Sequence, residues 1–113
     1  MKLKQVKEIL GAEVLTGEEF LENEVYSACG CDLMSDVLAF VKDRAILLTG
    51  LMNPQVIRTA EMMDIETVIF VRGKKPGDEI IGMAKMKDIA IMTTELPLYI
   101  ASGKLYEAGL KNE

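Results

Sequence analysis

The sequence predicts a single α/β domain with three layers, in which a mostly parallel sheet is flanked by helices and built from successive strand-helix units. Continuous aliphatic runs at residues 45–48, 67–71 and 89–92 are typical of strands that are buried on both faces. Each run is followed by a short turn and then by one of the three prolines of the chain. A proline favours the first turn of a helix, because its missing N–H would be unpaired there. This repeated order of strand, turn and helix indicates parallel strands joined by helical crossovers.

The composition fits one domain that spans residues 1–113. A chain of 113 residues buries roughly two-thirds of the surface that its unfolded form exposes. Hydrophobic residues make up 50% of the chain, but only 5% are aromatic and Trp is absent, so Ile, Leu, Val, Ala and eight Met must form the core. No linker or low-complexity tract divides the sequence.

The first elements are shorter and less regular. An amphipathic helix is predicted before Gly11, which is a suitable stop. Residues 12–15 favour a strand, and residues 16–19 a turn that leads into a further helical turn. The side chains that define the first helix by their helical spacing are Leu3, Val6, Ile9 and Leu10.

A second strand is predicted at residues 25–29, followed by a turn in which Asp32, together with Ser35, caps the next helix. Further along, Asn53 precedes Pro54 as a helix cap, and acidic residues follow Pro76 at a predicted helix start. Methionines on or beside apolar faces should fill the core or an interface. The residues expected to face inward from the helix after Asp32 are Leu33, Val37, Leu38 and Val41; the methionines are Met62, Met63, Met83, Met86 and Met92.

Charge and residue content exclude several classes of function. The formal net charge is -5, so no basic surface favours a nucleic-acid partner. The absence of His removes the most common general base and transition-metal ligand. No apolar run of about 18 residues predicts a membrane span, and the N-terminus does not have the features of a signal peptide, so we expect a cytoplasmic protein.

The carboxyl edge of the predicted sheet is the place where a ligand would bind, because the turns after parallel strands meet there. Its two cationic side chains could neutralise a small anion, its glycines could allow close approach of the backbone, and its hydroxyl groups could donate hydrogen bonds. The same residue types are common in tight turns for structural reasons alone. The candidate ligand-binding residues are Thr49, Gly50, Asn53, Arg72, Gly73, Lys74, Thr93 and Thr94.

A second cluster consists of Cys29, Cys31 and Asp32. Thiolates near a helix start could react, become oxidised or share a soft metal, but two thiols do not complete a four-ligand site. The structural alternative is that both cysteines pack in a strand end and turn. An enzyme that uses Asp32 or Cys31 with Arg72 is a third alternative. Neither phosphate-binding glycine motif is present, and we expect no cofactor.

The strand-to-turn segments resemble the DRTGG domain family. The resemblance is carried by AILLTGLMNPQV at residues 45–56, VIFVRGKKP at 68–76 and IMTT at 91–94, and it covers almost the whole chain. This family is similar to the N-terminal domain of HPr kinase/phosphorylase and accompanies CBS domains in pyrophosphatases. The resemblance implies an α/β fold and a regulatory or dimerising accessory role, without catalytic residues. The stretch CGCDLMSD at residues 29–36 is also similar to stand-alone members that accompany iron-only hydrogenase genes.

We therefore expect a non-catalytic, ligand-sensing regulatory domain that binds a small anionic metabolite or nucleotide and contacts a partner enzyme. The alternative is a hydrogenase-associated redox or iron–sulfur accessory protein that uses Cys29 and Cys31. A homodimer is also expected, because the last predicted helix is apolar enough to contact a second subunit. Its apolar residues are Leu98, Ile100, Ala101, Leu105, Tyr106 and Leu110.

Overall fold

The computed structural model describes residues 1–40 and 45–111, and its centre is a five-stranded sheet. The strand order is β1-β5-β4-β3-β2, in which β2 to β5 are parallel and β1 pairs antiparallel with β5. The α/β fold with a mostly parallel sheet is thus confirmed. The strands are β1 (Glu13–Thr16), β2 (Ser27–Gly30), β3 (Ala45–Thr49), β4 (Thr67–Phe70) and β5 (Ala90–Thr93).

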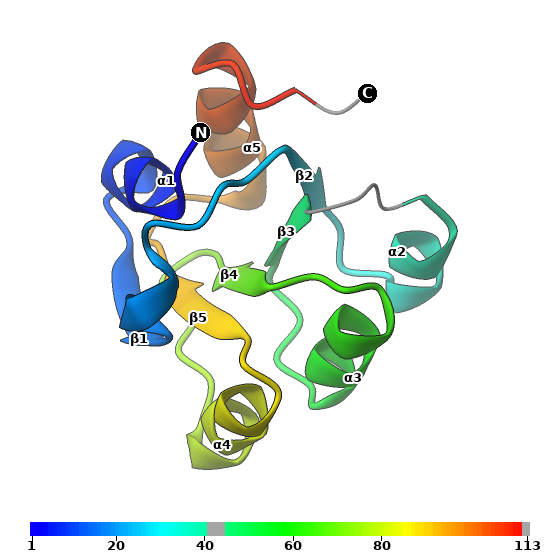
Figure 1. The fold of residues 1–113 in the computed structure, drawn as a ribbon. Coiled ribbons are helices and arrows are strands. Elements are labelled where there is room, and N and C mark those ends of the chain that lie inside the picture. Colours follow the sequence, from blue (N-terminus) through cyan, green and yellow to red (C-terminus); the bar gives the residue numbers. More distant parts are fainter. Residues whose placement is uncertain (41–44, 112–113) are drawn as a thin grey trace.

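Helices cover both faces of this sheet and complete the three layers (Figure 1). One face packs against α2, α3 and α4, and the other against α1 and α5. This arrangement follows from the chain order, because successive right-handed crossovers between neighbouring parallel strands place their helices on the same side. The helices are α1 (Leu3–Leu10), the short 3-10 helix η1 (Glu18–Phe20), α2 (Met34–Phe40), α3 (Gln55–Met62), α4 (Asp78–Met86) and α5 (Leu98–Glu107).

The three inner strands, β3, β4 and β5, are buried along their whole length. Alternate side chains enter different cores: Leu47 packs toward α2 and α3, whereas its neighbour Leu48 packs toward α1 and α5. This two-sided burial explains why the sequence of these strands is continuously aliphatic rather than alternating. Met92 of β5 is fully buried, as predicted.

The prolines stand at helix starts as expected. Pro54 and Pro97 directly precede α3 and α5, and Pro76 lies two residues before α4. Asn53 also has its predicted role, since its Oδ1 accepts a hydrogen bond of 2.8 Å from the Gln55 N–H in the first turn of α3.

Two predictions about inward-facing side chains are wrong. Leu33 and Leu38 are 58% and 42% exposed, because α2 begins at Met34 and turns Met34 and Val37 toward the sheet instead. A helix this short contacts the sheet through a single narrow stripe. Val41, the fourth predicted residue, lies outside the described residues.

The methionine prediction allowed either the core or an interface, and the structure tests only the core. Met63 and Met83 are half-buried against the α2–α4 core, but Met62 and Met86 are 70% and 83% exposed at the ends of α3 and α4. Neither exposed side chain fills the core.

The C-terminal helix α5 packs its inner side against the core of the same chain. Ala101, Leu105 and the following Leu110 are buried against β2, β3 and α1, whereas Tyr99 and Tyr106 remain exposed on its outer side. Within residues 1–40 and 45–111, no helix has the length and apolar character needed to cross a membrane.

Gly17, directly after β1, lets the backbone pass close to Ala90 at the start of β5. Its φ is +92°, and a Cβ atom at this position would lie 2.6 Å from the Cα of Ala90. Both features require glycine, because an L-residue is strained at this φ and the neighbouring atom belongs to the backbone of β5. Gly17 therefore lets the chain turn from β1 into η1 directly over the sheet.

We predict that Gly17→Ala destabilises the fold by more than about 2 kcal/mol, through left-handed strain and the clash with Ala90. Gly82→Ala is the matched control, because Gly82 lies within α4 and an added Cβ would meet nothing within 4 Å. This control should raise stability by about 0.5–1 kcal/mol through helix propensity. Urea unfolding measures both, and similar effects of the two substitutions would contradict the packing described for Gly17.

Candidate functional site

The carboxyl ends of the four parallel strands lie side by side at one edge of the sheet. The register pairs Gly30 with Leu48, Thr49 with Phe70, and Phe70 with Thr93, so the strands end at nearly the same level. The turns that follow β2, β3, β4 and β5 are therefore neighbours. We call this the carboxyl-edge site, and it contains Asp32, Thr49, Gly50, Arg72, Gly73, Lys74, Thr93, Thr94 and Glu95.

Asp32 joins the turn after β2 to the end of β3. Its Oδ1 accepts hydrogen bonds of 2.8 Å from the Thr49 hydroxyl and 2.8 Å from the Gly50 N–H. The predicted role of Asp32 as a cap of α2 is thus corrected, since Oδ1 is directed to β3. The Gly50 N–H contributes most to lowering the pKa of Asp32, burial opposes it, and the Thr49 hydroxyl, Lys74 and Arg72 lower it further.

Lys74 extends this network to the turn after β4. Its Nζ donates a hydrogen bond of 2.8 Å to the carbonyl of Gly50. The N–H and C=O of Gly50 are therefore both bonded, to Asp32 and Lys74 respectively. A Cβ at Gly50 would make ordinary contacts, 3.7 Å from Lys74 Nζ and 3.8 Å from Asp32 Oδ1, so packing there does not require glycine.

Arg72 and Gly73 form a left-handed turn, with φ values of +59° and +67°. Their N–H groups donate to the carbonyls of Leu96 (2.9 Å) and Thr94 (2.7 Å), which fixes the turn beside the end of β5. The Arg72 side chain is exposed and forms no salt bridge with another described residue. A cationic group is thus presented to solvent on a firmly held backbone.

Glu95 is a residue of this site that the sequence prediction missed. Its two carboxylate oxygens lie 2.8 and 2.9 Å from the position that a Cβ of Gly73 would occupy. The carboxylate therefore rests on Gly73, between Arg72 and Lys74 in sequence. The signal that could have identified Glu95 is its place in the turn after β5, immediately beyond Thr93 and Thr94.

The threonine hydroxyls of the site are engaged within the chain. Thr93 donates to the carbonyl of Lys74 (2.7 Å), and Thr94 donates to the carbonyl of Leu10 at the end of α1 (2.8 Å). Both threonines are buried. Their direct contacts therefore hold the turns and α1 in place, and the exposed polar groups of the site are its charged side chains.

Both cysteines pack against the α2–α4 core and are half-buried. The Cys31 Sγ exchanges hydrogen bonds with the backbone of Leu33, at 3.3 Å to its carbonyl and 3.4 Å from its N–H. Burial raises the pKa of Cys29, and the nearby Cys31 and Asp36 raise it further. The described residues contain no group of three or more Cys, Asp or Glu side chains arranged to hold a metal ion.

A groove of about 600 Å³ lies along the outer side of α5, and its lining residue Ser102 is next to Gly30 at the end of β2. Tyr99 and Tyr106 flank Gly103, and the side chain of Lys111 lies 5.2 Å from the centre of the Tyr106 ring. The remaining lining residues are Ser102 and Glu107. The charged groups of the carboxyl-edge site do not contribute to this groove.

The pKa of Asp32 leads to a prediction about acid stability. A carboxyl group whose folded pKa is below its ordinary value of 3.8 adds stability above that value, and this stability is lost as the pH falls through the folded pKa. At neutral pH, Asp32→Asn should therefore cost about 0.5–1 kcal/mol, a figure that allows for solvent screening. The cost should vanish at strongly acidic pH.

Urea unfolding at neutral and strongly acidic pH tests this prediction. Glu8→Gln on the exposed side of α1 is the control and should have little effect at either pH. A difference between wild type and Asp32→Asn that does not change with pH would contradict the role of the ionised carboxylate.

Comparison with known proteins gives a likeness of fold. No protein-family model matches the sequence, and no curated protein matches it either. Among solved structures, the chain is similar to the CBS and DRTGG domains of the regulatory region of Clostridium perfringens pyrophosphatase, which was crystallised with its activator, diadenosine tetraphosphate. The TM-score is 0.74 and the identity 21%, over 92% of this chain and 45% of the other. The chain thus spans less than half of that structure, and the match shows a shared fold.

Proposed function

We propose that this chain is a non-catalytic regulatory domain that binds a small anionic ligand at its carboxyl edge. The observation that carries the proposal is the turn after β4, which presents the side chains of Arg72 and Lys74 to solvent from a backbone fixed by hydrogen bonds. Arginine offers a planar set of donors that suits phosphate or carboxylate groups, and lysine adds a compact positive charge. An anion bound here would contact groups from several strands at once.

The chemistry of the neighbouring groups supports binding more than catalysis. The lowered pKa of Asp32 keeps this group an ionised hydrogen-bond acceptor at neutral pH, so it is a poor proton donor. The hydroxyls of Thr49, Thr93 and Thr94 donate to a carboxylate or to backbone carbonyls, so activating one as a nucleophile would break a structural contact.

The similar structure belongs to a regulatory region and contains a nucleotide activator. We extend this to the present chain as a hypothesis: its ligand is a nucleotide or a related phosphorylated metabolite, and its response is passed to a partner enzyme. The position of the carboxyl edge agrees with the general rule that open parallel sheets bind ligands beyond the ends of their strands.

Self-association through the outer side of α5 is part of the proposal. Tyr99, Ile100 and Tyr106 are exposed there, and aromatic residues gathered on one face are typical of interfaces. A homodimer related by two-fold symmetry would cover this surface on both subunits.

The redox alternative has weaker support. Thiolate is the reactive and metal-binding form of cysteine, and the raised pKa of Cys29 disfavours it at neutral pH. Both cysteines also contribute to the packing of the α2–α4 core.

We predict that the ligand-binding activity depends on Arg72 and Lys74. Wild-type protein should be stabilised in thermal-shift assays by at least one member of a panel of nucleotides and phosphorylated metabolites. Arg72→Ala and Lys74→Ala should each weaken binding by on the order of tenfold, measured by calorimetry, since each removes a charge-assisted contact. High salt should weaken binding as well.

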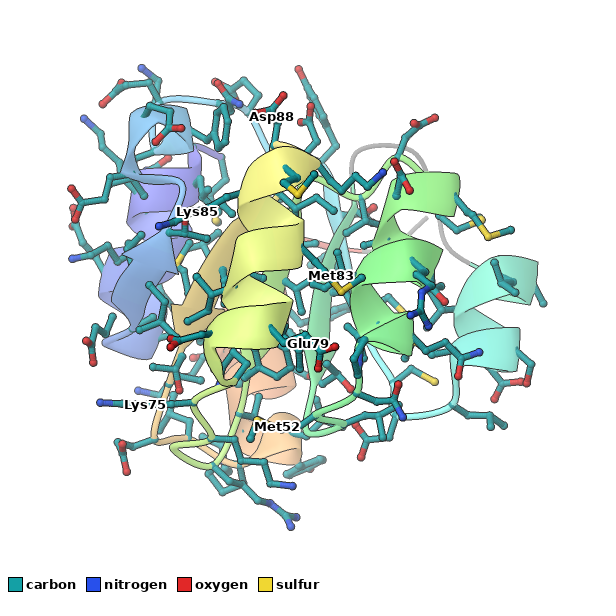
Figure 2. All side chains as sticks on the ribbon, turned by 90° about the horizontal axis from the view of Figure 1, so that it is seen from below. Met52, Lys75, Glu79, Met83, Lys85 and Asp88 are labelled. Carbon is teal, nitrogen blue, oxygen red and sulfur yellow. The ribbon has the colours of Figure 1, made fainter. Side chains whose placement is uncertain are left out.

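Lys85→Ala is the matched control. Lys85 is an exposed lysine near the C-terminal end of α4, whereas Lys75 and Met52 mark the opposite, carboxyl-edge end of the domain in Figure 2. Its substitution should leave the affinity unchanged. Binding that is equally insensitive to Arg72→Ala and Lys74→Ala would exclude the carboxyl edge as the site.

We also predict that Tyr106→Glu weakens self-association by about tenfold or more, because it replaces an aromatic side chain of the interface with a charged one that would have to lose its water on association. Light scattering after size-exclusion chromatography measures this effect. Met86→Glu is the control, since Met86 is also exposed but lies on α4, on the other face of the sheet. A wild-type protein that stays monomeric at high concentration would contradict the dimer.

A further inference from the structure

The carboxyl-edge site contains acidic groups as well as basic ones, and this mixture restricts the ligands that it suits. Arg72 and Lys74 supply two positive charges, and Asp32 and Glu95 supply two negative charges, so the formal charge of the four side chains is zero. A bare multivalent anion would gain from the cations but would be repelled by the carboxylates. Charge attraction alone therefore does not explain what such a site would select.

We propose that Glu95 makes the site selective for phosphate esters that carry hydroxyl groups, such as nucleotides and sugar phosphates, over anions that carry no hydrogen-bond donor, such as sulfate. This inference rests on the proposed function, because it assumes that Arg72 and Lys74 hold the phosphate. It adds a second requirement for the ligand, which is a hydrogen-bond donor next to the phosphate that can bond to the Glu95 carboxylate.

The position of Glu95 supports this role. Its carboxylate rests on Gly73, the residue between Arg72 and Lys74, with its oxygens 2.8 and 2.9 Å from the position of an added Cβ. A ligand held by the two cationic side chains would consequently meet the carboxylate next to its phosphate. In an ester, the group attached at that point is the sugar.

The state of the Glu95 side chain also fits a ligand contact. It is exposed and forms no salt bridge with another described residue, in contrast to Glu13, which pairs with Lys75 at 3.2 Å on the rim of the same edge. An ionised carboxylate only accepts hydrogen bonds, so its suitable partners on a ligand are hydroxyl or amino groups.

The backbone holds Glu95 in this position. On one side, the N–H of Gly73 donates to the carbonyl of Thr94; on the other, the N–H of Arg72 donates to the carbonyl of Leu96. The Glu95 backbone is thus framed by two hydrogen bonds to the turn that carries the cations. These bonds fix where the Glu95 side chain leaves the backbone, beside the two cationic residues, before any ligand binds.

Calorimetric titration tests the proposal. The probes are adenosine 5′-monophosphate and ribose 5-phosphate as hydroxyl-bearing esters, and sulfate and selenate as bare anions, because inorganic phosphate at neutral pH carries a P–OH group that would itself donate to a carboxylate. Wild type should prefer an ester by on the order of tenfold or more, the size expected of a hydrogen bond to a charged group. Glu95→Gln keeps the shape of the side chain and removes its charge, and should reduce this preference to about threefold or less, chiefly by tightening the binding of the bare anions.

Glu66→Gln is the matched control and should keep the wild-type preference, because Glu66 is exposed and directly precedes β4, at the opposite end of the strand from the carboxyl edge. An unchanged preference in Glu95→Gln, or a wild type that binds sulfate as tightly as either ester, would overturn the role of Glu95 while leaving the anion site intact. Loss of the proposed function has a different signature: no probe binds wild type, or Arg72→Ala and Lys74→Ala bind every probe like wild type. Comparison of the two esters separates recognition of a sugar phosphate from that of a whole nucleotide.

Discussion

Burial of β3, β4 and β5 on both faces is the constraint from which the rest of the structure follows. A strand covered by helices on each side has no position for a charged side chain along its length, since an unpaired buried charge is very costly. The polar chemistry of this domain is therefore confined to the strand ends. Because β2 to β5 run in parallel, the turns after them meet at one edge.

Hydrogen bonds between neighbouring turns give that edge its shape. Thr49 and Thr94 serve it in the same way: each hydroxyl accepts a bond from the N–H two residues later and donates to a distant part of the chain. Thr49 thereby reaches Asp32, and Thr94 reaches the end of α1. Thr49 and Thr94, which the sequence suggested as ligand-binding residues, thus stabilise the turns. The charged side chains of Arg72, Lys74 and Glu95 remain exposed to solvent.

The sequence predicted the features that depend on local patterns. Two-sided burial produces continuous aliphatic runs, and helix starts favour proline, so β3, β4, β5 and the helices after them could be recognised. The direction of the Asp32 carboxylate could not be recognised. An Asp that caps the next helix and an Asp that bonds to the next strand stand at the same position of such a turn, so the sequence pattern is the same for both. The prediction that Leu33 faces inward was wrong. The residue at which a short helix begins determines which of its side chains face the sheet, and packing against the sheet determines that residue.

Glu95 illustrates a further limit. Contact between Glu95 and Gly73 depends on how two turns, each attached to a different strand, approach one another, and no spacing in the sequence encodes this. The apolar character of the C-terminal segment predicted contact with a second subunit, but no pattern in the sequence predicted the groove along α5. What the sequence did not reveal is that Ala101 and Leu105 are used by the domain's own core and that two tyrosines form the outer side.

The central claim is that a phosphorylated ligand binds at the carboxyl edge, and two-dimensional NMR of the ¹⁵N-labelled protein tests it most directly. Titration with adenosine 5′-monophosphate should shift the amide resonances of Gly50, Arg72, Gly73 and Lys74 in a saturable manner, with little change at the outer residues of α5. Saturable shifts confined to Ser102, Gly103 and Tyr106, or no saturable shifts with any phosphorylated compound tested, would contradict the account.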